Sequence, residues 1–138
     1  MFGGSINFSQ EPYGKMQIWG SIWGVKAGSH PFHVHEFGDL REGCASTGMH
    51  WDPTGVMGTD QLPLGDLDNV IADKNGDANV EMRDTDLQLW GDDSIVGRAL
   101  VIHHVLDKEG NGGGPRIGCC TIGLAASPKK EVYSQPRY

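Results

Sequence analysis

The chain has 138 residues, including 21 glycines, and a formal net charge of −7. This length suits one domain with its own core. The 11 lysines and arginines form no block, which argues against nucleic acid and anionic membrane surfaces as partners, and no apolar run is long enough for insertion into a membrane.

Short runs between clusters of glycine, aspartate and asparagine predict an all-β sandwich or barrel. Strands are expected at residues 5–10, 16–23, 32–37, 67–72, 78–83, 99–104 and 117–124. Turn-forming residues at 10–14 and 73–77 predict hairpin connections. The two long loops, at residues 38–65 and about 105–116, have a length typical of functional loops. We expect one β domain at residues 1–126, followed by a polar tail or linker at 127–138.

The segment HPFHVHEF, residues 30–37, contains three of the six histidines. Residues i and i+2 of a strand point to the same face, so His33 and His35 could present two imidazoles to one ion. Imidazole suits zinc, copper, iron and nickel, and the pair alone does not choose among them. The alternative is a half-exposed strand with a polar outer face. His30 precedes Pro31 and is expected in a turn at the surface, outside the site.

Further candidate ligands are His50 and one member of the adjacent pair His103 and His104. Neighbouring strand residues face opposite ways, so only one of the pair can join the same site. The periodicity does not say which. The three cysteines allow one disulfide and leave one thiol, and their number does not identify the pair.

Taken together, these motifs resemble the copper/zinc superoxide dismutase family. FHVHEFGD (32–39) is similar to the family's copper signature, and GCASTGMH (43–50) to the segment from a cysteine to the histidine that bridges two metals. The segments GDL (65–67), NVIADKNG (69–76), SIVGRALVIH (94–103), PRIGC (115–119) and IGLA (122–125) follow in family order. The resemblance covers about residues 4–126. It implies a Greek-key β-sandwich or barrel of immunoglobulin-like architecture.

The resemblance also implies the roles of particular residues. The copper ligands would be His33, His35, His50 and His103. Arg116 matches the arginine that guides superoxide to the copper, and superoxide is then the expected substrate.

Three further positions carry a family role. Cys44 and Cys119 match the intrasubunit disulfide, which leaves Cys120 as the odd thiol. Asp107 matches an aspartate that connects the metal ligands, and we expect it to orient His33.

The chain departs from the family at the zinc site. His50 and Asp66 remain, but residues 51–65 contain no histidine and Pro63 stands where the last zinc histidine is expected. A closed zinc site normally has four protein ligands, so we expect one copper ion and no zinc. The second nitrogen of His50 then needs another partner, with Asp66 as the first candidate and Asp60 as the second. The loop at 105–116 is also short for the family, and both departures resemble its copper-only branch.

Another departure lies at the first ten residues, which resemble the second strand of the family. The resemblance therefore implies that the usual first strand is absent, and the edge near 117–124 is expected to be unpaired. Residues 131–138, a neighbouring repeat or a second molecule could pair there.

The expected function is superoxide disproportionation to dioxygen and hydrogen peroxide by one redox-cycling copper. The alternatives are a copper-buffering domain without useful turnover and a structural module of a repeat protein. The implied disulfide favours an extracellular, secreted location.

Overall fold

The computed structural model describes residues 1–110 and 114–126. The predicted tail at 127–138, with its suggested extra strand, lies outside them. The strands are β1 (Gly3–Gln10), β2 (Met16–Trp23), β3 (Gly28–His30), β4 (Phe32–His35), β5 (Arg41–Cys44), β6 (Val70–Ala72), β7 (Ala78–Thr85), β8 (Ala99–His103) and β9 (Arg116–Thr121), and the single helix among the described residues is the 3₁₀ turn η1 (Ala45–Thr47). No helix in this part of the chain is long and apolar enough to cross a membrane.

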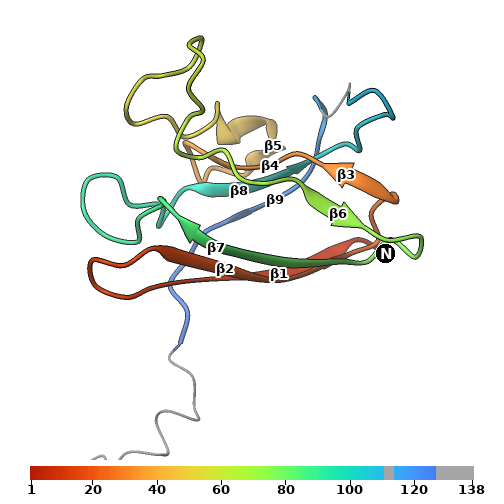
Figure 1. Cartoon of the computed structure of the whole chain (residues 1–138), viewed down its shortest axis with the longest axis horizontal. Helices are drawn as coiled ribbons and strands as arrows, with labels where there is room; N and C mark the ends of the chain where they lie inside the picture. The colour runs from red at the N-terminus through yellow and green to blue at the C-terminus, as the bar shows by residue number, and fades with distance from the viewer. Residues whose placement is uncertain (111–113, 127–138) are drawn as a thin grey trace, which may run out of the picture.

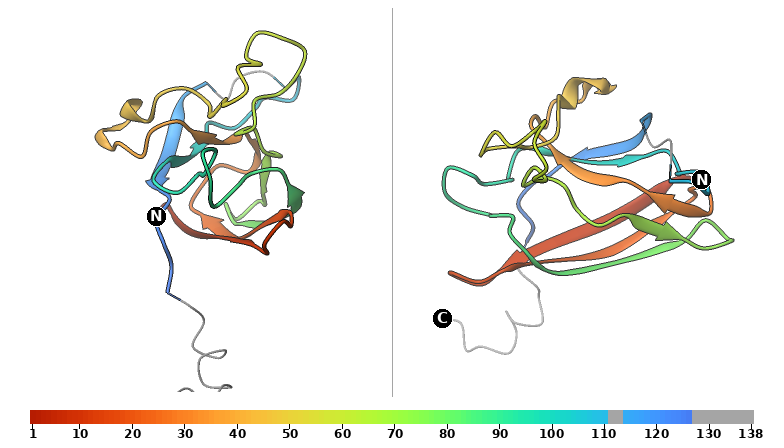
Figure 2. Two further views of the ribbon diagram at one scale, coloured as in Figure 1. Left: turned by 90° about the vertical axis from the view of Figure 1, so that its left-hand side faces the viewer. Right: turned by 45° about the horizontal axis from the view of Figure 1, so that its top comes forward.

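The strands form two layers, as predicted for a β-sandwich (Figure 1). One layer is the antiparallel sheet β1-β2-β7, the other is β4-β8-β9, and the short pair β3-β6 lies beside them. Neighbours such as β2 and β7, or β4 and β8, are far apart in sequence, which is the Greek-key arrangement expected from the motifs. The loop that follows β4 projects from one end of the sandwich, and Figure 2 shows it from two further sides.

All seven predicted strands are present, with shorter ends for several of them. β4 ends at His35 rather than at Phe37, β6 starts at Val70, and β9 ends at Thr121. The strands β3 and β5 were not predicted. Each has only three or four residues and lies beside a loop, so neither contains enough alternation to identify it.

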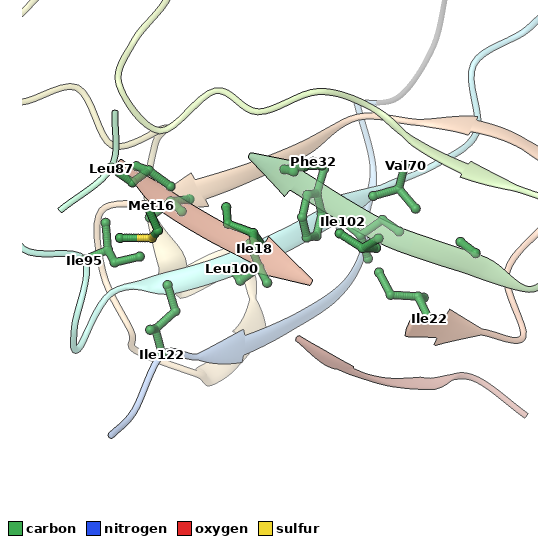
Figure 3. Close-up of a cluster of buried hydrophobic side chains, with 14 of the residues drawn as sticks. Met16, Ile18, Ile22, Phe32, Val70, Leu87, Ile95, Leu100, Ile102 and Ile122 are labelled. Atoms are coloured by element: carbon green, nitrogen blue, oxygen red, sulfur yellow. The ribbon is translucent and has the colours of Figure 1, made fainter. Parts of the chain in front are cut away.

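The core lies between the two layers and contains side chains from β2, β4, β6, β7 and β8, with Leu87, Ile95 and Ile122 from the connecting segments (Figure 3). β4 contributes Phe32 and Val34, which are 1% and 0% exposed. β8 contributes Leu100 and Ile102 from the same face of its sheet. Because side chains alternate along a strand, His33, His35 and His103 lie on the opposite face. The core therefore fixes the direction in which three histidines point.

The sandwich is open between β1 and β9. Within the described residues no strand pairs with the outer edge of either, which agrees with the expected unpaired edge. A cavity of about 120 Å³ lies there, lined mainly by apolar side chains that include Phe2, Ile6 and Leu100. Ile6 and Phe8 pack against the core but stay partly exposed. The core is thus less completely covered along this side.

Candidate metal centre

Two histidines of the site come from β4. His35 is fully buried and His33 is half-buried, and both lie on the face opposite Phe32 and Val34. The alternation predicted for this segment is therefore present. It excludes the alternative of a polar face directed to solvent, because His35 is 0% exposed.

The two edges of β4 bring the remaining ligand residues next to His33 and His35. On one side β4 pairs with β8, and the backbone N–H of His103 donates to the carbonyl of Pro31 at 2.9 Å. On the other side β4 makes two isolated bridges, between His35 and His50 and between His33 and Asp66. His103, and not His104, thus lies with the other histidines.

Gly65 allows the segments of His50 and Asp66 to approach this second edge of β4. The backbones of Val34, Trp51 and Gly65 bond to one another: the Gly65 N–H donates to the Trp51 carbonyl, the Gly65 carbonyl accepts from the Val34 N–H, and the Trp51 N–H donates to the Val34 carbonyl, each at 2.8 Å. A Cβ atom at Gly65 would overlap the Val34 carbonyl oxygen and lie 2.9 Å from the Trp51 side chain. Glycine is needed here because the backbones approach so closely, and this approach places Asp66 beside His50.

The four histidines form a compact cluster. One ring nitrogen from each of His33, His35, His50 and His103 lies within 4.8 Å of all the others, and no other group of this kind occurs among residues 1–110 and 114–126. The Nε2 atoms of His35 and His103 are 3.5 Å apart. Together with Pro31, Met49, Gly114 and Arg116, the four rings line a cavity of about 390 Å³.

Hydrogen bonds on the second ring nitrogen orient three of the histidines. His35 Nδ1 lies 3.0 Å from the Gly48 carbonyl, His103 Nδ1 3.1 Å from the Gly114 carbonyl, and His50 Nδ1 2.7 Å from Asp66 Oδ1. A neutral ring that donates from Nδ1 turns the lone pair of Nε2 toward the cluster. Asp66, rather than the exposed Asp60, is the carboxylate at His50.

His33 differs from the other three. Its Nδ1 is buried and has no hydrogen-bond partner among the described residues. An unpaired buried nitrogen costs free energy unless something binds it. A metal ion bound by His33 Nδ1 and three Nε2 atoms would satisfy all four rings, so the donor set fits a metal that prefers imidazole, such as copper or zinc.

Burial lowers the basicity of the two β4 histidines. Desolvation, followed by repulsion from the His50, His103 and His35 rings, lowers the pKa of His33 from 6.5 to about 3. Desolvation is also the main cause for His35, whose pKa falls to about 4 although its bond to Gly48 raises it. Both rings are therefore neutral at physiological pH, the form in which imidazole binds metals.

Arg116 lines the same cavity and is held by the loop after β4. Its Nη1 donates to the Cys44 carbonyl at 2.9 Å and to Thr47 Oγ1 at 3.0 Å. The Cys44–Cys119 disulfide, predicted from the resemblance, is present with a Cα–Cα distance of 5.7 Å and ties this loop to β9. Sequence reasoning missed Thr47, which is fully buried and has no motif to signal its role.

His30 corrects one expectation. It was predicted at the surface in a turn, but it belongs to β3 and is only 1% exposed. Its Nδ1 and Nε2 lie 2.8 and 2.7 Å from the carbonyls of His103 and Lys26. Pro31 therefore separates two strands rather than marking a surface turn. His30 remains outside the four-histidine cluster, as predicted.

The last two predicted positions are not among the residues that line the metal cavity. Asp107 follows β8, where its carboxylate accepts a bond from the Glu109 backbone at 3.0 Å. Its link to His33 stays a prediction. Cys120 is a free cysteine at the cavity between β1 and β9. The residue as a whole is exposed, but partial desolvation of its thiol raises the pKa.

Comparison with known proteins gives one family. The family model described as copper/zinc superoxide dismutase matches residues 2–122. A similar protein is superoxide dismutase [Cu-Zn] 3 of Arabidopsis thaliana, 38% identical over 138 aligned positions that cover 90% of this chain and 84% of the relative. Another is superoxide dismutase [Cu-Zn] 2 of Mesembryanthemum crystallinum, 40% identical, covering 90% and 88%.

The lowered pKa values of His33 and His35 predict how the stability of the metal-free protein depends on pH. In the unfolded chain these imidazoles take up protons near pH 6.5, whereas in the folded protein they do so only near pH 3–4. Stability should therefore be full above about pH 6.5 and fall as the pH decreases toward 4. Thermal unfolding of the metal-free protein between pH 7.5 and 4.5 measures this slope.

The substitution His35→Gln should flatten that slope. His104→Gln, at the exposed histidine that follows His103, is the matched control and should leave the slope unchanged. Equal slopes for all three proteins would contradict the role given to the buried ring.

Proposed function

The chain belongs to the copper/zinc superoxide dismutase family, and from this premise we propose that it is a superoxide dismutase with one copper ion and no zinc. The observation that carries the proposal is the cluster of four ring nitrogens within 4.8 Å of one another. His33, His35, His50 and His103 would hold the copper. Bound there, copper supplies one-electron chemistry by alternating between two oxidation states, which converts two superoxide ions and two protons into dioxygen and hydrogen peroxide.

The protein contributes orientation and charge to this reaction. The carbonyls of Gly48 and Gly114 hold the rings of His35 and His103 at a fixed angle. Asp66 accepts a hydrogen bond from the Nδ1–H of His50, which fixes the tautomer of that ring and leaves its Nε2 lone pair for a metal. Two of these partners are backbone carbonyls, and the third, Asp66, is held by its backbone bridge to His33. The donor atoms therefore need little rearrangement when the metal binds.

The proposal that zinc is not used has two supports. His50 and Asp66 are the only residues that match the zinc ligands of the family, and residues 51–65 supply no histidine. The Nδ1 atom of His50 lies 2.7 Å from Asp66 Oδ1, so this nitrogen has a carboxylate partner without a second metal. Two donors are too few for a closed four-coordinate site. In this chain the carboxylate alone would act on the second nitrogen of His50.

Arg116 would attract and position the superoxide anion. Its guanidinium lies at the cavity that the four histidines line, in a protein with a formal net charge of −7. Local positive charge in a cleft can raise the association rate of an anion by about 10–10³-fold. Its bonds to Cys44 and Thr47 hold the side chain in place while leaving other N–H groups for the substrate.

The Cys44–Cys119 disulfide supports a further part of the proposal, an extracellular location. Disulfides persist in oxidising compartments and are rare in the cytosol. Fractionation of the source cells measures the location, and a protein found only in a reducing cytosol would contradict it.

We also retain self-association through the last strand, or contact with a neighbouring repeat, as a proposal. It is supported by the exposed outer edge of β9 and the apolar cavity beside it. A lysine on an edge strand discourages pairing. If β9 edges associate, Ile117→Lys should lower the apparent mass in sedimentation equilibrium, and an unchanged mass would remove this proposal.

Metal loading tests the proposed function directly. Metal-free protein supplied with copper alone should bind one copper per chain and disproportionate superoxide rapidly, and added zinc should change neither value. Elemental analysis and a superoxide assay measure the two quantities. Zinc bound in equimolar amount, with higher turnover, would contradict the zinc-free site. Copper bound without turnover would instead favour a buffering domain.

Charge reversal tests the role of Arg116. Arg116→Glu should lower kcat/KM for superoxide much more than Lys108→Glu, which reverses an exposed charge in the preceding loop. In the parent protein the rate should fall as ionic strength rises, because salt screens the attraction. Arg116→Lys keeps the charge and separates attraction from the loss of the bonds to Cys44 and Thr47. Equal losses for the Arg116→Glu and Lys108→Glu variants would contradict the assignment.

A further inference from the structure

Met49, the residue before His50, carries a thioether and is among the residues that line the cavity of the four histidines. It is 63% exposed. Met16 and Met82 are buried in the core, and the exposed Met1 and Met57 do not line this cavity. Met49 is thus at the mouth of the site, with its side chain accessible to an incoming ion.

The backbone of Met49 is fixed although its side chain is exposed. Its carbonyl accepts a hydrogen bond from the Glu36 N–H at 2.9 Å, and the next residue bridges β4 through His35 and His50. Methionine is unbranched, with three rotatable bonds beyond this anchored backbone. The thioether can therefore move between solvent and the cavity without any change in the fold.

Sulfur gives this cavity a donor that the histidines do not provide. Thioethers and thiolates are soft ligands that prefer cuprous copper, whereas imidazole binds several metals. Cys44 and Cys119 are joined in a disulfide, and Cys120 lies at the other cavity, between β1 and β9. Among the described residues that line the metal cavity, Met49 is the one sulfur donor.

From these observations we infer that Met49 is an entry ligand for cuprous copper. A Cu–S bond to Met49 forms when the ion reaches the cavity and breaks as bonds to the histidine nitrogens replace it. The oxidation state of the copper does not change in this exchange, so no electron donor or acceptor is needed. The thioether is neutral and carries no proton at any ordinary pH, so this capture needs no deprotonation.

This inference rests on the proposed function, because it presumes that copper is the metal of the site. Its test uses loading rates rather than turnover. Metal-free protein is mixed anaerobically with a coloured cuprous chelate, and the loss of the chelate absorbance gives the rate of transfer. A parallel experiment with a cupric chelate measures the uptake of the harder ion. The variant is Met49→Leu, which has a similar volume and lacks the sulfur.

The control is Met57→Leu, which removes an exposed sulfur from the same loop but outside the cavity. Met49→Leu should slow cuprous transfer several-fold and leave cupric uptake unchanged, while Met57→Leu should alter neither. Thermal unfolding checks that both variants are folded, which is expected because Met49 and Met57 are 63% and 48% exposed and lie outside the core.

Three results would overturn the inference. Equal cuprous rates for the parent and Met49→Leu would show that the sulfur is not used. Equal slowing of cuprous and cupric uptake would show that the side chain only shapes the opening. If the parent protein takes up neither ion, the proposed copper function itself fails, and that result is distinct from the other two.

Discussion

The two-sided pairing of β4 is the constraint on which the site depends. This strand of four residues pairs with β8 along one edge and bridges to His50 and Asp66 along the other. Its alternation sends Phe32 and Val34 into the core and the two histidines to the opposite face. The hydrophobic effect thus holds the ligands in place indirectly, because any rotation of the strand that moved the rings would also expose core side chains.

A series of contacts that runs from β9 to β4 also holds the ligands in place. The disulfide ties Cys44 to β9, Arg116 of β9 bonds to Cys44 and Thr47, and Thr47 Oγ1 lies 3.4 Å from His35 Nδ1. The bond from Arg116 to Thr47 joins residues 69 positions apart. The cation and the ligand set are therefore positioned by one connected group of contacts, which explains how a long loop can contribute to a rigid site.

The strands β2, β4, β7 and β8 could be predicted from alternation because each has one face in the core. β3 and β5 could not, since three or four residues contain too little alternation to distinguish a strand from a loop. The face of His33 and His35 followed from their spacing, whereas the choice of His103 over His104 and the pairing of Cys44 with Cys119 came from the family resemblance. The burial of His30 and the contact of Thr47 with Arg116 depend on residues distant in sequence, which no local pattern reports.

β8 has a consequence for any attempt to redesign this protein. All five of its residues are buried, with Leu100 and Ile102 in the core and His103 at the metal cavity. This one strand therefore borders both the hydrophobic core and the metal cavity. A substitution on it alters core packing and ligand position together. The catalytic centre cannot be treated as a module that is exchanged independently of the scaffold. Substitutions that vary metal preference or substrate access are better placed in residues 38–65. Side chains of this loop reach the cavity, and the core does not enclose the loop.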